Sequence, residues 1–260
     1  MHVTRRGSGR PLVLVHGLGG SAHSWTPVLD GLAAHHEVVA PDLPGHGQTP
    51  LQGTATVGGL TDALTAWLAE EGLADAPLVG SSLGARMVLE MVRRGTARGP
   101  VVALDPGGFW SRGESLWFRA TLGPSLRLVR ALQPRLPAIA GTAAGRTALL
   151  AQVSARPWEL EPDFVVTELR GFTAPAVLPV YDDLAHGPRQ EGAPRGSAPG
   201  PLVIGWGRHD RLTVTAQAQR AAAVFPDARL HWFADSGHFP QWDEPDEVVR
   251  VVREAVGGHR

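Results

Sequence analysis

The chain has 260 residues, of which 43% are apolar and 19% charged, and its formal net charge is −1. This balance is typical of a globular protein with a sizeable core, and it excludes a disordered or membrane-embedded chain. Because the net charge is near zero, no global field attracts nucleic acid or an anionic membrane, and we expect neither as a partner. All 24 basic residues are arginine and there is no cysteine. The chain therefore lacks the side chains needed for a phosphate-loop lysine, a Schiff base, a disulfide or a thiolate metal site.

Targeting signals are not evident. No run approaches the roughly 20 apolar residues of a membrane span. The pair Arg5-Arg6 precedes an apolar run of only four residues, 12–15, which is too short for an export signal. We therefore expect a cytoplasmic protein that acts on a small molecule. The sequence does not indicate the oligomeric state.

Short apolar runs recur along the chain and predict six buried strands, at residues 12–15, 37–40, 77–80, 101–104, 202–205 and 230–233. They are continuously apolar, as expected of parallel strands covered on both faces. Helical periodicity lies between them, as in residues 57–68, and it returns near the C-terminus. The pattern predicts an α/β fold with a mostly parallel central sheet flanked by helices.

The regular alternation stops after Gly108 and resumes at Pro201. The interval contains apolar and aromatic residues at helical spacing and ends in a Pro/Gly-rich connector, residues 187–201. We expect a core made of residues 1–108 and 201–260, with residues 109–200 forming a helical lid and its return loop. Arginines dominate residues 109–156, where they outnumber the single acid Glu114 by seven to one. We expect these arginines to form a solvated surface rather than to bind an anionic substrate.

Gly80-Ser81-Ser82-Leu83-Gly84 fits the pattern G-x-S-x-G at the end of a predicted strand. In this arrangement the serine occupies a sharp, strained turn into a helix, and the flanking glycines let strand and helix approach. Asp210 follows the predicted strand at 202–205, and His238 follows the strand at 230–233. A serine needs a base to become nucleophilic, and the imidazole needs a carboxylate to fix its tautomer. We therefore predict Ser82 as nucleophile, His238 as base and Asp210 as acid.

These stretches resemble the α/β-hydrolase superfamily, in the branch with a lid late in the chain. The resemblance rests on His16-Gly17-Leu18-Gly19-Gly20, the turn Pro41 to Gly47, the Ser82 turn and the segment from Gly237-His238 to Glu244-Pro245. It implies an oxyanion hole formed by the backbone N–H groups of Leu18 and Leu83. It also implies that the first antiparallel strand of the family sheet is missing, because about ten residues precede the strand at 12–15.

The resemblance implies a serine hydrolase that cleaves an ester, thioester or lactone of a small hydrophobic molecule through an acyl-serine. Serine at this position argues against epoxide and carbon–halogen chemistry. Carbon–carbon bond hydrolysis and perhydrolysis with the same triad stay open. We expect no cofactor and no metal, and we regard a non-catalytic receptor on the same fold as less favoured.

Three further alternatives concern particular segments and residues. Gly17-Leu18-Gly19-Gly20-Ser21-Ala22 fits the G-x-G-x-x-A of dinucleotide-binding units, and an NAD(P)-dependent enzyme is the rival it suggests. Pro27 and the bulky residues before it disfavour the helix which that rival requires. Asp105 also follows a strand and is the alternative acid to Asp210. The aromatic residues Phe109, Trp110, Trp117 and Phe118 are predicted mainly to pack, with pocket lining as the alternative.

Overall fold

The computed structural model describes residues 1–257 and contains one seven-stranded sheet with the order β1-β3-β2-β4-β5-β6-β7. The strands are β1 (Val3–Arg6), β2 (Pro11–Val15), β3 (Glu37–Pro41), β4 (Leu78–Ser81), β5 (Val101–Leu104), β6 (Leu202–Gly207) and β7 (Ala228–Phe233). All neighbouring strands are parallel except β1, which is antiparallel to β3. The predicted fold class is confirmed, and each of the six predicted strands is present.

The expectation that the antiparallel strand is missing is wrong. β1 pairs with β3 in the register Val3 to Pro41 through Arg6 to Val38. Its residues Val-Thr-Arg-Arg contain no apolar run and are only half-buried or exposed. An edge strand is held by backbone hydrogen bonds on one side and needs little burial of its own side chains, so the hydrophobic pattern did not reveal it.

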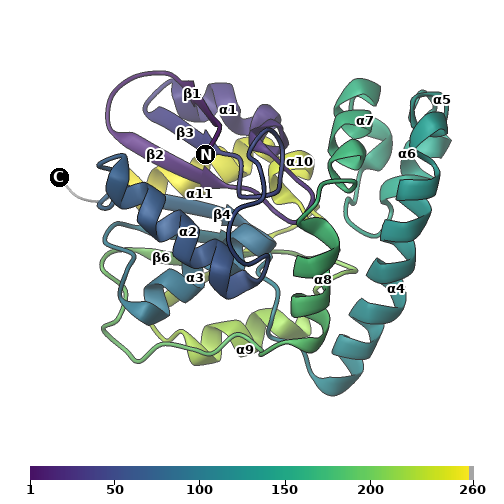
Figure 1. The fold of residues 1–260 in the computed structure, drawn as a ribbon. Coiled ribbons are helices and arrows are strands. Elements are labelled where there is room, and N and C mark those ends of the chain that lie inside the picture. Colours follow the sequence, from purple (N-terminus) through teal and green to yellow (C-terminus); the bar gives the residue numbers. More distant parts are fainter. Residues whose placement is uncertain (258–260) are drawn as a thin grey trace.

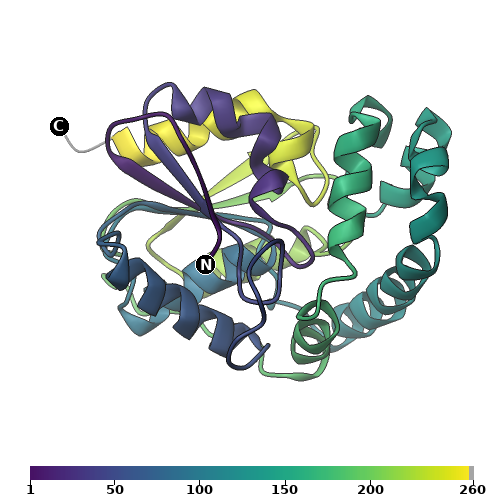
Figure 2. The same cartoon turned by 45° about the horizontal axis from the view of Figure 1, so that its top comes forward.

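Helices cover both faces of the sheet (Figures 1 and 2). One face packs against α1 (Thr26–Ala33) and α11 (Pro245–Gly257), and the other against α2 (Val57–Glu70), α3 (Leu83–Arg94) and α9 (Ala216–Val224). Val79, Val102 and Val203 point to the first face, whereas the neighbouring residues Leu78, Val101 and Leu202 point to the second. This alternation of buried apolar side chains explains why the strand sequences are continuously apolar.

The chain between β5 and β6 forms a separate group of helices. These are α4 (Arg112–Ala131), α5 (Leu136–Ala140), α6 (Ala143–Leu150), α7 (Pro162–Gly171) and α8 (Val177–His186), with short 3-10 turns at Gln133–Arg135 and Pro157–Glu159. Figure 1 shows them in teal and green, together at one side of the sheet. Ser111 caps the long helix α4 in a capping box with Glu114. The group has its own buried cluster, which also includes Phe239 and Trp242 from the segment after β7. That segment contains the short helix α10 (Pro240–Asp243).

Candidate active site

Ser82 lies at the turn between β4 and α3 in the conformation φ 54°, ψ −109°. A non-glycine residue in this region is strained, and it persists only where its surroundings hold it. The glycines on either side make the turn possible. A Cβ on Gly80 would lie 2.3 Å from the Gly84 carbonyl oxygen, and a Cβ on Gly84 would lie 2.1 Å from that of Val15. The G-x-S-x-G spacing therefore has the steric basis that the sequence suggested.

His238 lies in the loop after β7 with its imidazole buried against the serine. Its Nε2 is 2.8 Å from the Ser82 Oγ, and its Nδ1 is 2.8 Å from the Asp210 Oδ2. The backbone N–H of His238 donates to the Val153 carbonyl oxygen at 2.9 Å, so the segment between β5 and β6 helps to hold the loop. A carboxylate only accepts hydrogen bonds, so the proton lies on Nδ1 and leaves Nε2 free to accept from the serine hydroxyl.

Asp210 follows β6 and is 5% exposed. Its Oδ1 accepts from the backbone N–H groups of Leu212 at 2.7 Å and Thr213 at 3.0 Å. Burial alone would raise the pKa of Asp210, but the charge and hydrogen bond of His238 and the hydroxyl of Thr213 together lower it. The carboxyl is therefore held in its ionised form beside the imidazole.

Thr213 is a member of the site that the sequence analysis missed. Its hydroxyl donates to Asp210 Oδ2 at 2.5 Å and lies 3.1 Å from His238 Nδ1. Thr213 therefore fixes the carboxylate on the same oxygen that faces the imidazole. The signal was present as Asp-Arg-Leu-Thr, since an aspartate accepting from backbone N–H groups two and three residues later is a common turn motif.

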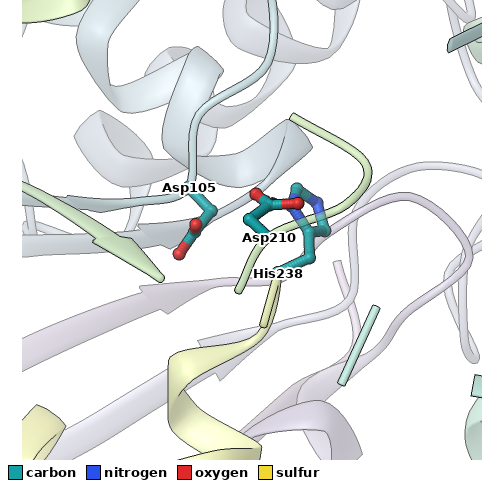
Figure 3. A group of neighbouring side chains, drawn as sticks. All are labelled: Asp105, Asp210 and His238. Carbon is teal, nitrogen blue, oxygen red and sulfur yellow. Dashed lines mark hydrogen bonds and ion pairs between the residues drawn. The ribbon is translucent and has the colours of Figure 1, made fainter. Parts of the chain in front are cut away.

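The alternative acid Asp105 lies close to His238 but is not hydrogen-bonded to it. One ligand atom from each of Asp105, Asp210 and His238 falls within 4.8 Å of the others, and Figure 3 shows the three side chains gathered around the ends of β5 and β6. Asp105 Oδ1 accepts from the Gly207 N–H at 2.9 Å. Complete burial and the charge of Asp210 raise the pKa of Asp105 well above its ordinary value. Of the two carboxyls, Asp210 is the one bonded to His238.

Leu18 and Leu83, the predicted oxyanion donors, line the same cavity as Ser82. Leu83 is the first residue of α3, and the loop containing Leu18 runs past the serine, since a Cβ on Gly17 would lie 3.2 Å from the Ser82 Cβ. Within residues 1–257 the N–H groups of Leu18 and Leu83 donate to no protein acceptor. His16 supports the loop through bonds to the Gly17 carbonyl oxygen and the Leu43 N–H. The glycine-rich loop leads through the 3-10 turn Ala22–Trp25 into α1, and on its way it borders the serine.

A largely apolar cavity opens onto Ser82 and His238. Its walls include Trp110, Phe118 and Phe172. Trp110 and Phe118 stack with their ring centroids 4.7 Å apart. The pocket-lining alternative therefore holds for Trp110 and Phe118. Phe109 packs against Phe225 in the core, and Trp117 is half exposed with its indole N–H bonded to the Arg211 carbonyl oxygen.

The arginines of residues 109–156 do not line this cavity. Arg130 bonds the Phe172 carbonyl oxygen, Arg146 bonds the carbonyl oxygens of Ala140 and Trp158, and Arg156 pairs with Asp235. These contacts tie the helices to one another and to the core.

The residues around Ser82 thus combine a strained serine, a buried imidazole and a carboxylate in one hydrogen-bonded chain. The family model described as the alpha/beta hydrolase family matches residues 12–251. The chain belongs to the alpha/beta hydrolase family. The resemblance drawn from the sequence motifs is confirmed, and it assigns the glycine-rich loop to a hydrolase fold.

Two curated relatives cover nearly the whole protein. It is 29% identical over 98% of its length to the dihydrolipoyllysine-residue acetyltransferase component of the acetoin cleaving system of Cupriavidus necator, of which it spans 66%. It is 26% identical over 97% of its length to a 2-hydroxy-6-oxo-6-phenylhexa-2,4-dienoate hydrolase of Burkholderia cepacia, of which it spans 89%.

Among solved structures, a thermophilic esterase from Thermogutta terrifontis superposes with a TM-score of 0.72 at 19% identity, covering 97% of this chain and 91% of that one. At this identity the likeness shows the shared fold alone. None of the helices within residues 1–257 has the length and apolar character needed to cross a bilayer.

Proposed function

We propose that the protein is a serine hydrolase that cleaves carboxylic esters of small, largely apolar molecules. The observation that carries the proposal is the hydrogen-bonded chain from Ser82 through His238 to Asp210, with both distances at 2.8 Å and the serine in a strained turn. The three side chains come from the ends of three parallel strands, where an open α/β sheet binds its ligands. Their order along the chain, Ser, Asp, His, is that of this architecture.

In this mechanism Ser82 Oγ attacks the ester carbonyl while its proton passes to His238 Nε2. The imidazolium is stabilised by the ionised Asp210, whose other oxygen stays bonded to the backbone. The N–H groups of Leu18 and Leu83 are the proposed donors to the developing oxyanion. His238 then protonates the leaving alcohol, and a water deprotonated by His238 hydrolyses the acyl-serine and regenerates the hydroxyl.

We further propose that residues 109–200 act as a lid over the reacting groups. This segment supplies six of the ten apolar side chains that line the cavity at Ser82: Trp110, Phe118, Leu122, Val153, Phe172 and Leu184. Covering the serine excludes water and strengthens the hydrogen bonds to the oxyanion. The apolar walls favour substrates with a hydrophobic acyl or alcohol group.

Carbon–carbon bond hydrolysis is the second candidate. It is favoured by the match to the Burkholderia cepacia hydrolase over nearly the full length of both chains. The same nucleophile and base serve a ketone as well as an ester, because both substrates pass through an oxyanion. An activity screen of neutral esters, thioesters, lactones and a vinylogous 1,5-diketone separates the two candidates.

The first prediction concerns the nucleophile. A fluorophosphonate should form a covalent adduct at Ser82 on the folded protein, because only an activated hydroxyl reacts quickly, and peptide mass mapping locates the adduct. Ser82→Ala should abolish labelling and lower turnover on the order of 10⁴-fold or more. Ser81→Ala is the matched control: Ser81 is buried and its hydroxyl accepts from Gln241, so its loss should leave the adduct on Ser82. An adduct on any other residue would overturn the assignment.

A further inference from the structure

A second, small cavity borders the cavity at Ser82. Four residues, Leu18, Val153, Phe172 and Phe239, line both cavities. Beside its apolar walls, the second cavity contains three polar side chains that do not line the first: Ser24, Glu168 and Gln241. None of these three residues has a part in the proposed hydrolytic steps. A polar cavity next to a nucleophile is a place where part of a substrate can be recognised.

Glu168 is the ionisable residue of this cavity, and it comes from α7 in the segment between β5 and β6. It is 7% exposed, and its Oε2 accepts from the Ser24 hydroxyl at 2.7 Å. Burial raises the pKa of Glu168 to about 8, although the bond from Ser24 acts in the opposite direction. The charged side chains nearest to it on α7, Asp163 and Arg170, are exposed. Near neutral pH the carboxyl therefore carries a proton and can donate a hydrogen bond as well as accept one.

Gln241 supplies a second polar group to the same cavity. Its Nε2 donates to the Ser81 hydroxyl at 2.9 Å, which fixes the amide next to the nucleophile turn. Its Oε1 is buried and has no hydrogen-bond partner among residues 1–257. A buried acceptor without a partner destabilises the folded protein, so we expect this atom to accept a hydrogen bond from water or from a ligand.

No cation is available in either cavity. Among the described residues, neither cavity is lined by an arginine, and the chain has no lysine. A carboxylate placed here would lose its hydration without gaining an ion pair, and above pH 8 it would face an ionised Glu168. An uncharged hydroxyl has no such cost, since it can donate to Gln241 Oε1 and exchange a hydrogen bond with Glu168.

We propose that Ser24, Glu168 and Gln241 form a polar subsite that binds an uncharged hydroxyl group of the substrate, close to its ester bond, and that rejects a carboxylate at the same position. The inference rests on the proposed hydrolysis at Ser82 and names its substrate class: neutral hydroxy-esters with one apolar arm. It also separates this protein from an enzyme for a dienoate, which is an anion.

Three phenylacetate esters of nearly equal size test the subsite. Their alcohol parts are 2-hydroxyethyl, propyl and carboxymethyl, which end in a hydroxyl, a methyl and a carboxylate. We expect kcat/KM for the hydroxyethyl ester to exceed that for the propyl ester by about tenfold or more, and the carboxymethyl ester to be the poorest. In Glu168→Leu the hydroxyethyl-to-propyl ratio should fall to about one, whereas Glu168→Gln, which keeps a donor and an acceptor, should retain most of it.

Asp163→Asn is the matched control, because it removes an exposed carboxyl from the same helix and should leave the ratio unchanged. If Glu168→Leu does not fold, Gln241→Met tests the same ratio by removing the other acceptor while leaving α7 intact. A wild-type ratio near one, or an unchanged ratio in Glu168→Leu and Gln241→Met, overturns the subsite. Fluorophosphonate labelling of Ser82 keeps the two proposals apart. Labelling without discrimination among the esters removes the subsite alone, and the absence of labelling removes the hydrolase proposal and the subsite together.

Discussion

At the scale of single residues, the pKa values of the two buried aspartates shift in opposite directions because their surroundings differ. Asp210 receives two backbone N–H groups, the Thr213 hydroxyl and the imidazole, which favour its charge. Asp105 receives one backbone N–H and lies close to Asp210, and its charged form is disfavoured. Ser82 and Asp105 are also the two non-glycine residues of the described chain with positive φ, 54° and 47°. The fold therefore holds the strained Asp105 next to Asp210, in surroundings that disfavour its charged form.

Substituting each aspartate separately tests this division. Asp210→Asn should keep the fold but present the imidazole with an amide that stabilises the wrong tautomer, and turnover should fall about 10⁴-fold. Asp105→Asn replaces a carboxyl whose charged form is disfavoured with a group of the same shape, so turnover should stay within about tenfold of the wild type. Ester turnover and a thermal unfolding curve for both variants provide the measurement. A larger loss in Asp105→Asn, at equal stability, would assign the acid to the end of β5.

At the scale of elements, the buried strands and the serine turn could be predicted because local sequence patterns encode them. The buried strands are continuously apolar, and the serine turn is framed by glycines whose Cβ atoms have no room. Ser82, Asp210 and His238 were identified because each follows a strand, and the structure brings them together. The strand β1 was not predicted because an edge strand has little apolar signal. The polar cavity was not predicted because Ser24 and Glu168 are 144 residues apart and meet only in the folded chain.

The serine turn gives a prediction about packing between elements. Gly84→Ala should be strongly destabilising, by a few kcal/mol, and should displace Ser82, because the added Cβ would lie 2.1 Å from the Val15 carbonyl oxygen and backbone cannot move aside cheaply. Gly113→Ala in the first turn of α4 is the control, since nothing lies within 4 Å of its added Cβ and alanine favours a helix. Denaturant unfolding compares the two variants. Equal stability for both would contradict the steric account of the turn.

At the scale of the whole molecule, Glu168 connects the segment between β5 and β6 to the core. Its bond to Ser24 joins α7 to the 3-10 turn Ala22–Trp25 beside the glycine-rich loop. The native protein keeps a proton on this carboxyl up to a pH of about 8, whereas an unfolded chain releases it near the ordinary glutamate value of 4.5. Because the folded state binds the extra proton, the free energy of unfolding must decrease as the pH rises between these two values.

The Glu168→Gln variant isolates this contribution, since its amide stays uncharged at every pH and can still accept from Ser24. Wild type should lose roughly 3 kcal/mol more than the variant between pH 5 and pH 8.5, the equivalent of between two and three pKa units. Other groups titrate in both proteins and cancel in the difference. Urea unfolding of both proteins at the two pH values measures it, with Asp163→Asn as the control for an exposed carboxyl on the same helix. Parallel pH profiles for wild type and Glu168→Gln would mean that Glu168 ionises normally and that the cavity beside Ser82 admits water freely.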